Sequence, residues 1–263
     1  MAEDMKQSKH FVLVHGSNHG AWCWYKLKTR LEAAGYQVTT VDLAASGINV
    51  KAIQDVDTFD KYNEPLLEIM ASLPPHEKVI LVGHSLGGLN LALAMDKFPQ
   101  NVSVAVFLTA YMPDTIHHPS YVLDQSREKN RLDLMDTQIS PYDTSKPSLV
   151  SLTFGPKFLS SNLYQLSPSE DMELAKTLVR PGSLFLNDLS RANKFTNEGY
   201  GSVEQVYVVC SEDIAIPKEF QLWMIQNSPV REVFEIKGAD HMPMFSRTGE
   251  LSVCLLNIAR KYA

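Results

Sequence analysis

Residues 78–95 read KVILVGHSLGGLNLALAM, a short apolar run followed by a glycine-rich corner and a segment of strong helix formers. The run at 79–82 predicts a buried strand, and the leucine- and alanine-rich segment predicts a helix. Between them, GHSLG at 83–87 matches the pattern G-x-S-x-G in the strand–turn–helix context of a nucleophile elbow. Such a turn lifts the serine hydroxyl to a helix N-terminus, where backbone N–H groups favour developing negative charge. The stretch therefore predicts a nucleophilic serine at Ser85.

The rest of the chain alternates strand-like runs with segments of helical character. A helix is expected over 24–34, ending at Gly35, a residue typical of helix C-termini. Apolar strands separated by helices predict a mainly parallel central sheet with helices on both faces. Together with the elbow, this pattern predicts the α/β-hydrolase fold. The expected strands are FVLV (11–14), QVTTV (37–41), VILV (79–82), VSVAVFL (102–108), VYVV (206–209) and VFEI (233–236).

Residues 113–181 interrupt this alternation. The segment is rich in Ser, Pro, Asp and Tyr, and its strand signals are weak. We expect a mostly helical lid inserted into a core made of residues 1–112 and 182–263. The alternative is a set of ordinary surface helices and loops, which the sequence does not distinguish from a lid.

A serine hydroxyl becomes a useful nucleophile only when a base takes its proton. His241 is the last of eight histidines and follows the final predicted strand, which is where the chain order Ser…Asp…His places the base. Asp213, just after the strand at 206–209, is our choice for the carboxylate that orients the imidazole. Glu212 is its close competitor, and Asp240 is expected to shape or cap a loop.

Acyl transfer also needs two backbone N–H groups for the oxyanion. Leu86 supplies one candidate, because it follows the nucleophile. Ser17, in the loop after the first strand, supplies the other, and Gly16 beside it permits close backbone approach. An ordinary βα turn is the alternative interpretation of this loop. His84 lies next to the serine, so its side chain is expected to point away from the attacked carbon in a structural role.

The composition argues against several classes of partner and binding site. The chain has 263 residues, a formal net charge of -6 and no run rich in Lys or Arg, so neither nucleic acid nor a membrane surface is expected as a partner. Its three cysteines are scattered without a CxxC pair, which argues against disulfides and a zinc site and favours a reducing compartment. The N-terminal stretch lacks the apolar core of a signal peptide. We expect a cytoplasmic enzyme that uses no metal and no organic cofactor.

The sequence resembles the plant methylesterase family over nearly its whole length. That family includes methyl salicylate and methyl jasmonate esterases and is related to the plant α-hydroxynitrile lyases. The resemblance implies the hydrolase core with a lid, the triad and oxyanion donors named above, and a small-molecule methyl ester as substrate; homodimers are common among relatives. The matching segments include HFVLVHGSNHGAWCWYKL (10–27), VILVGHSLGG (79–88), SEDIAIP (211–217) and IKGADHM (236–242).

The lyase branch is the main alternative, because it uses the same triad to cleave cyanohydrins. One lyase group has threonine in place of Gly16 and lysine in place of Met242. Another has asparagine in place of Gly16 and phenylalanine in place of His84. This chain has the esterase residue at each position, and Met242 offers no cation for a departing cyanide.

Several departures from the family concern the substrate. Ser17 replaces a common alanine, Asn18 a usual cysteine or tyrosine, and Ile214 a frequent lysine; Leu134 lies near a tryptophan of some relatives. We expect the substrate pocket to include Gly16, Asn18, His84, Leu134 and Met242. Two further alternatives are a hormone-binding protein with little turnover and a broad esterase without a dedicated substrate.

Overall fold

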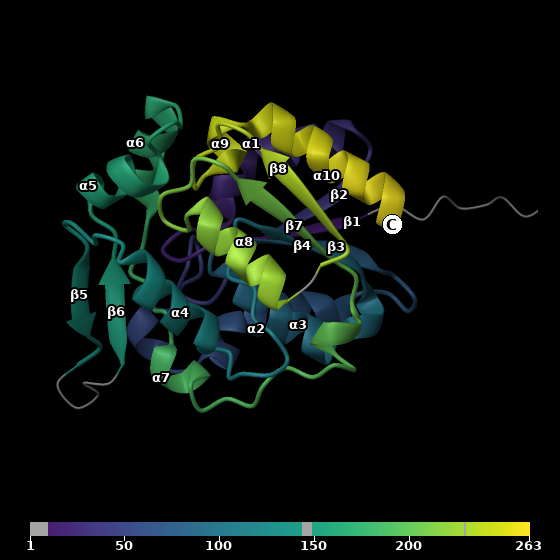
Figure 1. Ribbon diagram of the computed structural model, residues 1–263, viewed down its shortest axis with the longest axis horizontal. Helices are drawn as coiled ribbons and strands as arrows, with labels where there is room; N and C mark the ends of the chain where they lie inside the picture. Colours follow the sequence, from purple (N-terminus) through teal and green to yellow (C-terminus); the bar gives the residue numbers. More distant parts are fainter. Residues whose placement is uncertain (1–9, 144–148, 229) are drawn as a thin grey trace, which may run out of the picture.

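The computed structural model describes residues 10–143, 149–228 and 230–263. The polar stretch 1–9 and residues 144–148 of the expected lid lie outside the described residues. A central sheet is covered by helices on both faces, and a separate group of smaller elements lies to one side of it (Figure 1).

Within the described residues the central sheet has six strands in the order β2-β1-β3-β4-β7-β8, and every neighbouring pair is parallel. All six predicted strands are confirmed, each to within two residues at either end. Covering on both faces explains why β3 is buried at every position. The strands are β1 (His10–Val14), β2 (Gln37–Val41), β3 (Val79–His84), β4 (Val102–Leu108), β7 (Gln205–Cys210) and β8 (Glu232–Ile236).

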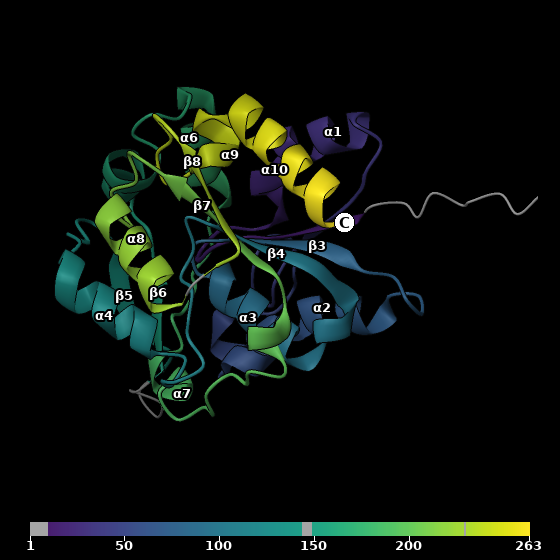
Figure 2. The same cartoon turned by 45° about the vertical axis from the view of Figure 1, so that its right-hand side comes forward.

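Two apolar clusters, one on each face, hold the helices to the sheet. Leu13 packs with the helices α1 (Tyr25–Ala33), α9 (Pro243–Ser246) and α10 (Thr248–Tyr262). Val12, the preceding residue on the same strand, points to the opposite face. That face carries α2 (Phe59–Ser72), α3 (Gly87–Lys97) and α8 (Lys218–Asn227), and Figure 2 shows the two layers from the side.

Short 3₁₀ turns connect several of these elements. They are η1 (Ala21–Trp24), η2 (Ile53–Asp55), η3 (Pro99–Asn101) and η5 (Tyr200–Ser202). The expected helix end at Gly35 is confirmed, since α1 stops just before it and Gly35 has φ 87°. Among the helices of the described ranges, none combines the length and apolarity that a bilayer span requires.

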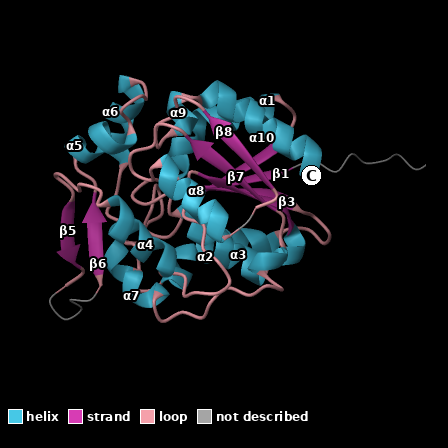
Figure 3. Ribbon diagram, viewed as in Figure 1, coloured by secondary structure: helices cyan, strands magenta, loops and turns pink. Residues whose placement is uncertain are grey.

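The segment between β4 and β7 contains several short helices and also a β-hairpin that we did not predict. β5 and β6 pair antiparallel with each other and form a separate sheet (Figure 3). β5 is exposed at every position, so it shows none of the apolar alternation that predicts a strand. The division into a core and a lid at 113–181 stays a prediction. The elements of this connection are α4 (Tyr121–Asn130), β5 (Gln138–Pro141), β6 (Val150–Thr153), α5 (Pro156–Phe158), the π-helical turn η4 (Leu159–Leu163), α6 (Ser169–Leu178) and α7 (Leu186–Leu189).

The elbow between β3 and α3 is shaped by close backbone packing. Ser85 has φ 56°, a left-handed conformation that is uncommon for residues other than glycine. A Cβ at Gly88 would lie 2.1 Å from the Tyr111 carbonyl oxygen, and one at Gly87 would lie 2.9 Å from the carbonyl oxygen of Val14. The glycines therefore let α3 pack directly against backbone at the carboxyl ends of β1 and β4.

Because of this packing, adding one methyl group should change the free energy of unfolding at Gly88 far more than at a glycine with open space around it. Gly88→Ala should lower the free energy of unfolding by about 3 kcal/mol, the upper end of the overpacking range, because its neighbour is rigid backbone. Gly249→Ala is the matched control, since a Cβ there meets nothing within 4 Å. It should be neutral or stabilising by up to about 1 kcal/mol. Urea unfolding of both variants tests this, and a Gly88→Ala protein as stable as wild type would contradict the packing described.

Candidate active site

Because the sheet is parallel, the loops that follow its strands meet at one edge. Ser85 follows β3, Asp213 follows β7 and His241 follows β8. Ser85 and His241 both line a cavity of about 410 Å³ that extends beneath the elements of the β4–β7 connection. The structure thus brings the predicted nucleophile and base to one cavity. Of the predicted residues, those lining it are Gly16, Ser17, His84, Ser85, Leu86, Leu134 and His241.

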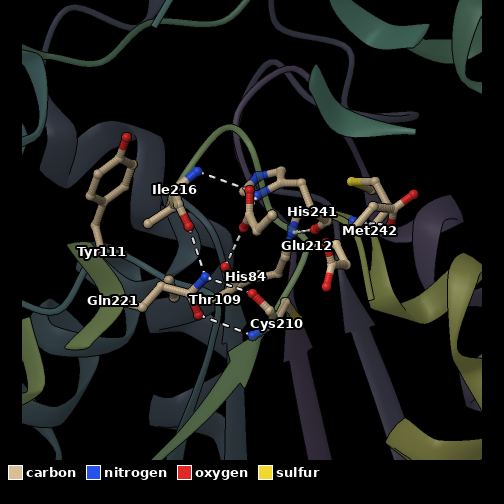
Figure 4. Close-up of polar contacts among 12 residues, drawn as sticks. His84, Thr109, Tyr111, Cys210, Glu212, Ile216, Gln221, His241 and Met242 are labelled. Carbon is tan, nitrogen blue, oxygen red and sulfur yellow. Dashed lines mark hydrogen bonds and ion pairs between the residues drawn. The ribbon is translucent and has the colours of Figure 1, made fainter. Parts of the chain in front are cut away.

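Asp213 and His241 form a buried hydrogen-bonded pair. The distance from His241 Nδ1 to Asp213 Oδ2 is 2.7 Å, and the two residues are 4% and 5% exposed. Asp213 also accepts hydrogen bonds from the Thr109 hydroxyl and from the backbone N–H of Ile216 (Figure 4). A neutral imidazole that donates from Nδ1 keeps its lone pair on Nε2, the atom that a base requires.

The neighbouring carboxylates of Glu212 and Asp240 form hydrogen bonds with other partners. Glu212 is exposed, and its carboxylate accepts a hydrogen bond from the Ser211 hydroxyl. Asp240 is fully buried and accepts hydrogen bonds from the backbone N–H groups of Met242 and Leu166. Asp213 is therefore the carboxylate on the imidazole, and Asp240 shapes the loop that carries His241.

Gln221 on α8 supports the loop that carries Asp213, a role that we did not predict from the sequence. Its amide donates to the carbonyls of Cys210 and Ile216 at 3.1 and 2.7 Å, and its oxygen accepts from the Cys210 N–H at 3.1 Å (Figure 4). Gln221 is fully buried and closes the loop that presents Asp213. A glutamine among the apolar residues of 220–224 was the available signal.

Two residues of the cavity wall have a backbone N–H without a partner among the described residues. Ser17 and Leu86 both line it, and within the described part of the chain neither N–H donates a hydrogen bond to another group. Buried N–H groups are normally paired, so two unpaired ones beside Ser85 indicate a site for an acceptor oxygen.

His84 supports the site and also lines it. Its Nε2 lies 2.7 Å from the His241 carbonyl oxygen, so this nitrogen carries a proton and donates. Burial lowers the pKa of His84 well below its usual value, and the nearby His241 adds to the shift. The expected structural role is thus observed, with a neutral imidazole that holds the backbone of His241.

Two residues expected in the pocket are not part of its wall. Asn18 is absent from the cavity wall, and its side chain donates to the carbonyls of Leu152 and Arg180. Met242 is fully buried in the apolar cluster beneath α10. Those two expectations were wrong because residues adjacent to a site residue point in different directions. Leu134 does line the cavity and is 43% exposed.

Comparison with known proteins supports the fold. The profile of the Alpha/beta hydrolase family matches residues 11–252. The chain belongs to the α/β-hydrolase family. It is 56% identical to Methylesterase 1 of Arabidopsis thaliana, with all of both chains covered. It is also 56% identical to Salicylic acid-binding protein 2 of Nicotiana tabacum, over 98% of this chain and 100% of the relative. The crystal structure of polyneuridine aldehyde esterase superposes with a TM-score of 0.94 at 50% identity, covering 96% of this chain and 100% of the other.

The cysteines of this α/β-hydrolase are free thiols. Burial raises the pKa of Cys23 and of Cys210 well above its usual value, so both thiols stay protonated and pack as small apolar groups. Across the described ranges, no three His, Cys, Asp or Glu side chains are grouped so as to hold a metal ion.

His19 is a third buried histidine on the cavity wall, after His84 and His241. Its Nδ1 donates to the Ser17 carbonyl at 2.9 Å, and its Nε2 accepts from the Tyr164 hydroxyl at 2.8 Å. Burial lowers the pKa of His19 to about 3. The imidazole is therefore neutral near pH 7 and fixes the carbonyl of the residue that carries one of the free N–H groups.

The lowered pKa of His19 predicts a pH-dependent loss of stability. The unfolded chain takes up this proton near pH 6.5 and the folded chain only near pH 3, so stability present above pH 6.5 is lost as the pH falls. Between pH 6.5 and 5 the His19 share is about 2 kcal/mol, at about 1.36 kcal/mol per pH unit. His19→Gln should flatten the dependence measured by urea unfolding by about this amount. His118→Gln, at an exposed histidine, is the control; equal slopes in His19→Gln and wild type would refute the assignment.

Proposed function

We propose that the protein hydrolyses the methyl ester of a small apolar acid through an acyl-enzyme on Ser85. The observation that carries the proposal is the pair of unpartnered N–H groups of Ser17 and Leu86 on the cavity wall that also holds Ser85 and His241. This is the set of parts that acyl transfer to a serine requires: a nucleophile, a base and an oxyanion site.

In the acylation step, Ser85 Oγ attacks the ester carbonyl carbon while His241 Nε2 takes the hydroxyl proton. The carbonyl oxygen becomes an oxyanion and accepts hydrogen bonds from the Ser17 and Leu86 N–H groups. Asp213 holds the imidazole in the correct tautomer and stabilises the imidazolium, without taking its proton. When the tetrahedral intermediate collapses, His241 returns the proton to the departing methoxide, which leaves as methanol.

Deacylation repeats the same proton transfers with water. His241 takes a proton from a water molecule that attacks the acyl carbon, and the second oxyanion forms between the same two N–H groups. On collapse the proton passes to Ser85 Oγ, which frees the carboxylic acid and restores the enzyme. Every proton in this scheme moves through His241.

The cavity wall supports an apolar acyl group. Most of its side chains are aliphatic or aromatic, and several come from the β4–β7 connection above the sheet. The relatives named methylesterase and salicylic acid-binding protein support a methyl ester of an aromatic or alicyclic acid. The apolar wall includes Leu132, Leu134, Ile139, Leu149, Leu152, Phe154, Phe158, Leu163, Leu184, Phe185, Leu186 and Ile216.

Local geometry argues against the cyanohydrin lyase alternative. A Cβ at Gly16 would lie 2.7 Å from Ser85 Cβ, so the threonine of one lyase group does not fit here without a shift of the elbow. Met242 places a buried thioether where those lyases have a lysine. A cytoplasmic location and a homodimer stay predictions.

The first test is a substrate panel assayed with wild-type and Ser85→Ala protein. Methyl salicylate, methyl jasmonate and methyl indole-3-acetate test ester hydrolysis, and mandelonitrile tests lyase activity. We expect release of one or more acids, reduced about 10⁶-fold by Ser85→Ala. Cyanide release without ester cleavage would establish the lyase instead. Tight binding of an acid with no turnover of any ester would establish a binding protein.

A second test separates the two adjacent acidic residues. Asp213→Asn should lower kcat about 10⁴-fold, because the imidazole loses the partner that fixes its tautomer. Glu212→Gln should leave kcat close to that of wild type, since the Glu212 carboxylate is exposed and bonds only its neighbour's hydroxyl. The reverse order of effects would show that Asp213 is not the acid of the triad.

A further inference from the structure

Asn18 is buried, and every polar atom of its side chain forms a hydrogen bond. The amide nitrogen donates two hydrogen bonds of 2.8 Å, to the carbonyls of Leu152 and Arg180. The amide oxygen accepts from the Ser17 hydroxyl at 2.9 Å. Asn18 is 2% exposed. Hydrogen bonds formed in this low-dielectric setting are strong and costly to break.

The partners of Asn18 belong to segments far away in the sequence. Leu152 lies in β6, and its N–H and C=O exchange hydrogen bonds of 2.8 and 2.9 Å with Gly182. Arg180 donates its backbone N–H to the Asn18 carbonyl at 3.0 Å. We call this group of residues, Asn18, Leu152, Arg180 and Gly182, the polar seam. It joins the loop after β1 to the hairpin β5–β6 and to the chain that returns from α6.

The outer side of the polar seam is also fixed. The guanidinium of Arg180 donates to three carbonyls of the loop after β2, those of Gly47, Asn49 and Lys51. Gly182 seats closely against the loop after β1, since a Cβ there would lie 3.1 Å from Ser17 Oγ. The buried amide of Asn18 therefore joins β6 and Arg180 to the loop after β1, and Arg180 extends the connection to the loop after β2.

The backbone at this position also suits asparagine. Asn18 has φ 63°, and asparagine adopts this left-handed conformation more readily than most residues. The cysteine or tyrosine that the family resemblance places here has no second hydrogen-bond donor. Neither could bind the Leu152 and Arg180 carbonyls together.

We propose that Asn18 is a positioning residue. Its amide ties the hairpin β5–β6 to the loop after β1, which we call the oxyanion loop, and keeps the Ser17 N–H turned into the cavity. Ser17 is held on two sides, by its hydroxyl bond to Asn18 and by the bond from His19 to its carbonyl. The inference rests on the proposed function, because it takes the Ser17 N–H as an oxyanion donor. Loss of the hydrogen bonds of Asn18 releases the Ser17 hydroxyl, so the Ser17 N–H is positioned less precisely toward the oxyanion.

Two substitutions remove the tie in different ways. Asn18→Gly deletes the amide and accommodates the positive φ without strain. Asn18→Asp keeps the shape and the acceptor but points carboxylate oxygen at two carbonyl oxygens. Each variant should lower kcat about 10–10²-fold, less than or equal to the loss of one oxyanion donor, while KM changes little.

A tetrahedral probe distinguishes this role from general structural support. Phenylboronic acid forms a tetrahedral adduct with an activated serine, so its affinity reports the oxyanion site. It should fall in both variants by about the factor lost in kcat, as expected for a transition-state mimic. Affinity for the product acid should stay unchanged. Unchanged kcat and boronate affinity in the two variants would overturn the proposal.

Asn162→Ala is the matched control. Asn162 is 5% exposed and also donates from its side chain to a backbone carbonyl, that of Asp133 at 3.0 Å, but within the described ranges its side chain makes no hydrogen bond to the loop after β1. Its kcat and boronate affinity should match wild type even where its melting temperature falls. An equal kcat loss in Asn162→Ala and Asn18→Gly would assign the effect to stability and overturn the proposal. Failure of the proposed function is recognised separately, because wild-type protein would then neither cleave esters nor bind boronate through Ser85.

Discussion

The left-handed turn at Ser85 is the constraint on which the site depends. A non-glycine residue at φ 56° costs roughly 1–2 kcal/mol, so tertiary packing has to hold the turn in place. The Ser85 carbonyl accepts hydrogen bonds from the N–H groups of Gly88 and Tyr111, at 3.1 and 3.0 Å. Gly87 lets α3 approach the end of β1. The same turn places Ser85 on the cavity wall and leaves the Leu86 N–H without a partner among the described residues, so the strain, the proposed nucleophile and the proposed oxyanion donor share one origin.

Around this turn, buried neutral histidines organise the backbone. Burial lowers the pKa of His15, His19 and His84, which keeps each ring uncharged with one N–H to donate. Each donates to a backbone carbonyl of the site, at 2.7, 2.9 and 2.7 Å respectively. The carbonyls are those of Gly16, Ser17 and His241. The site thus gains rigid dipoles without adding positive charge beside the imidazole of His241.

The strands, and the meeting of Ser85, Asp213 and His241 at one edge of the sheet, could be predicted because both depend on local pattern and on one topological rule. Parallel strands end at the same edge, so residues following β3, β7 and β8 meet however far apart they lie in sequence. Asn18 and Gln221 could not be assigned in this way, since their roles depend on partners chosen by tertiary packing. Asn18 reaches a carbonyl 134 positions away. The hairpin β5–β6 escaped prediction because β5 is exposed throughout and shows no apolar alternation.

The proposed function requires that the fold activates Ser85 and no other hydroxyl. Reaction with a diethyl aryl phosphate, followed by peptide mass spectrometry, tests this most directly, because a serine hydroxyl reacts efficiently with the reagent only when a base takes its proton. We expect one diethylphosphoryl group per chain on the peptide that contains Ser85, and loss of labelling in His241→Ala. A label on a different residue, or labelling of Ser85 that persists without His241, would contradict this account.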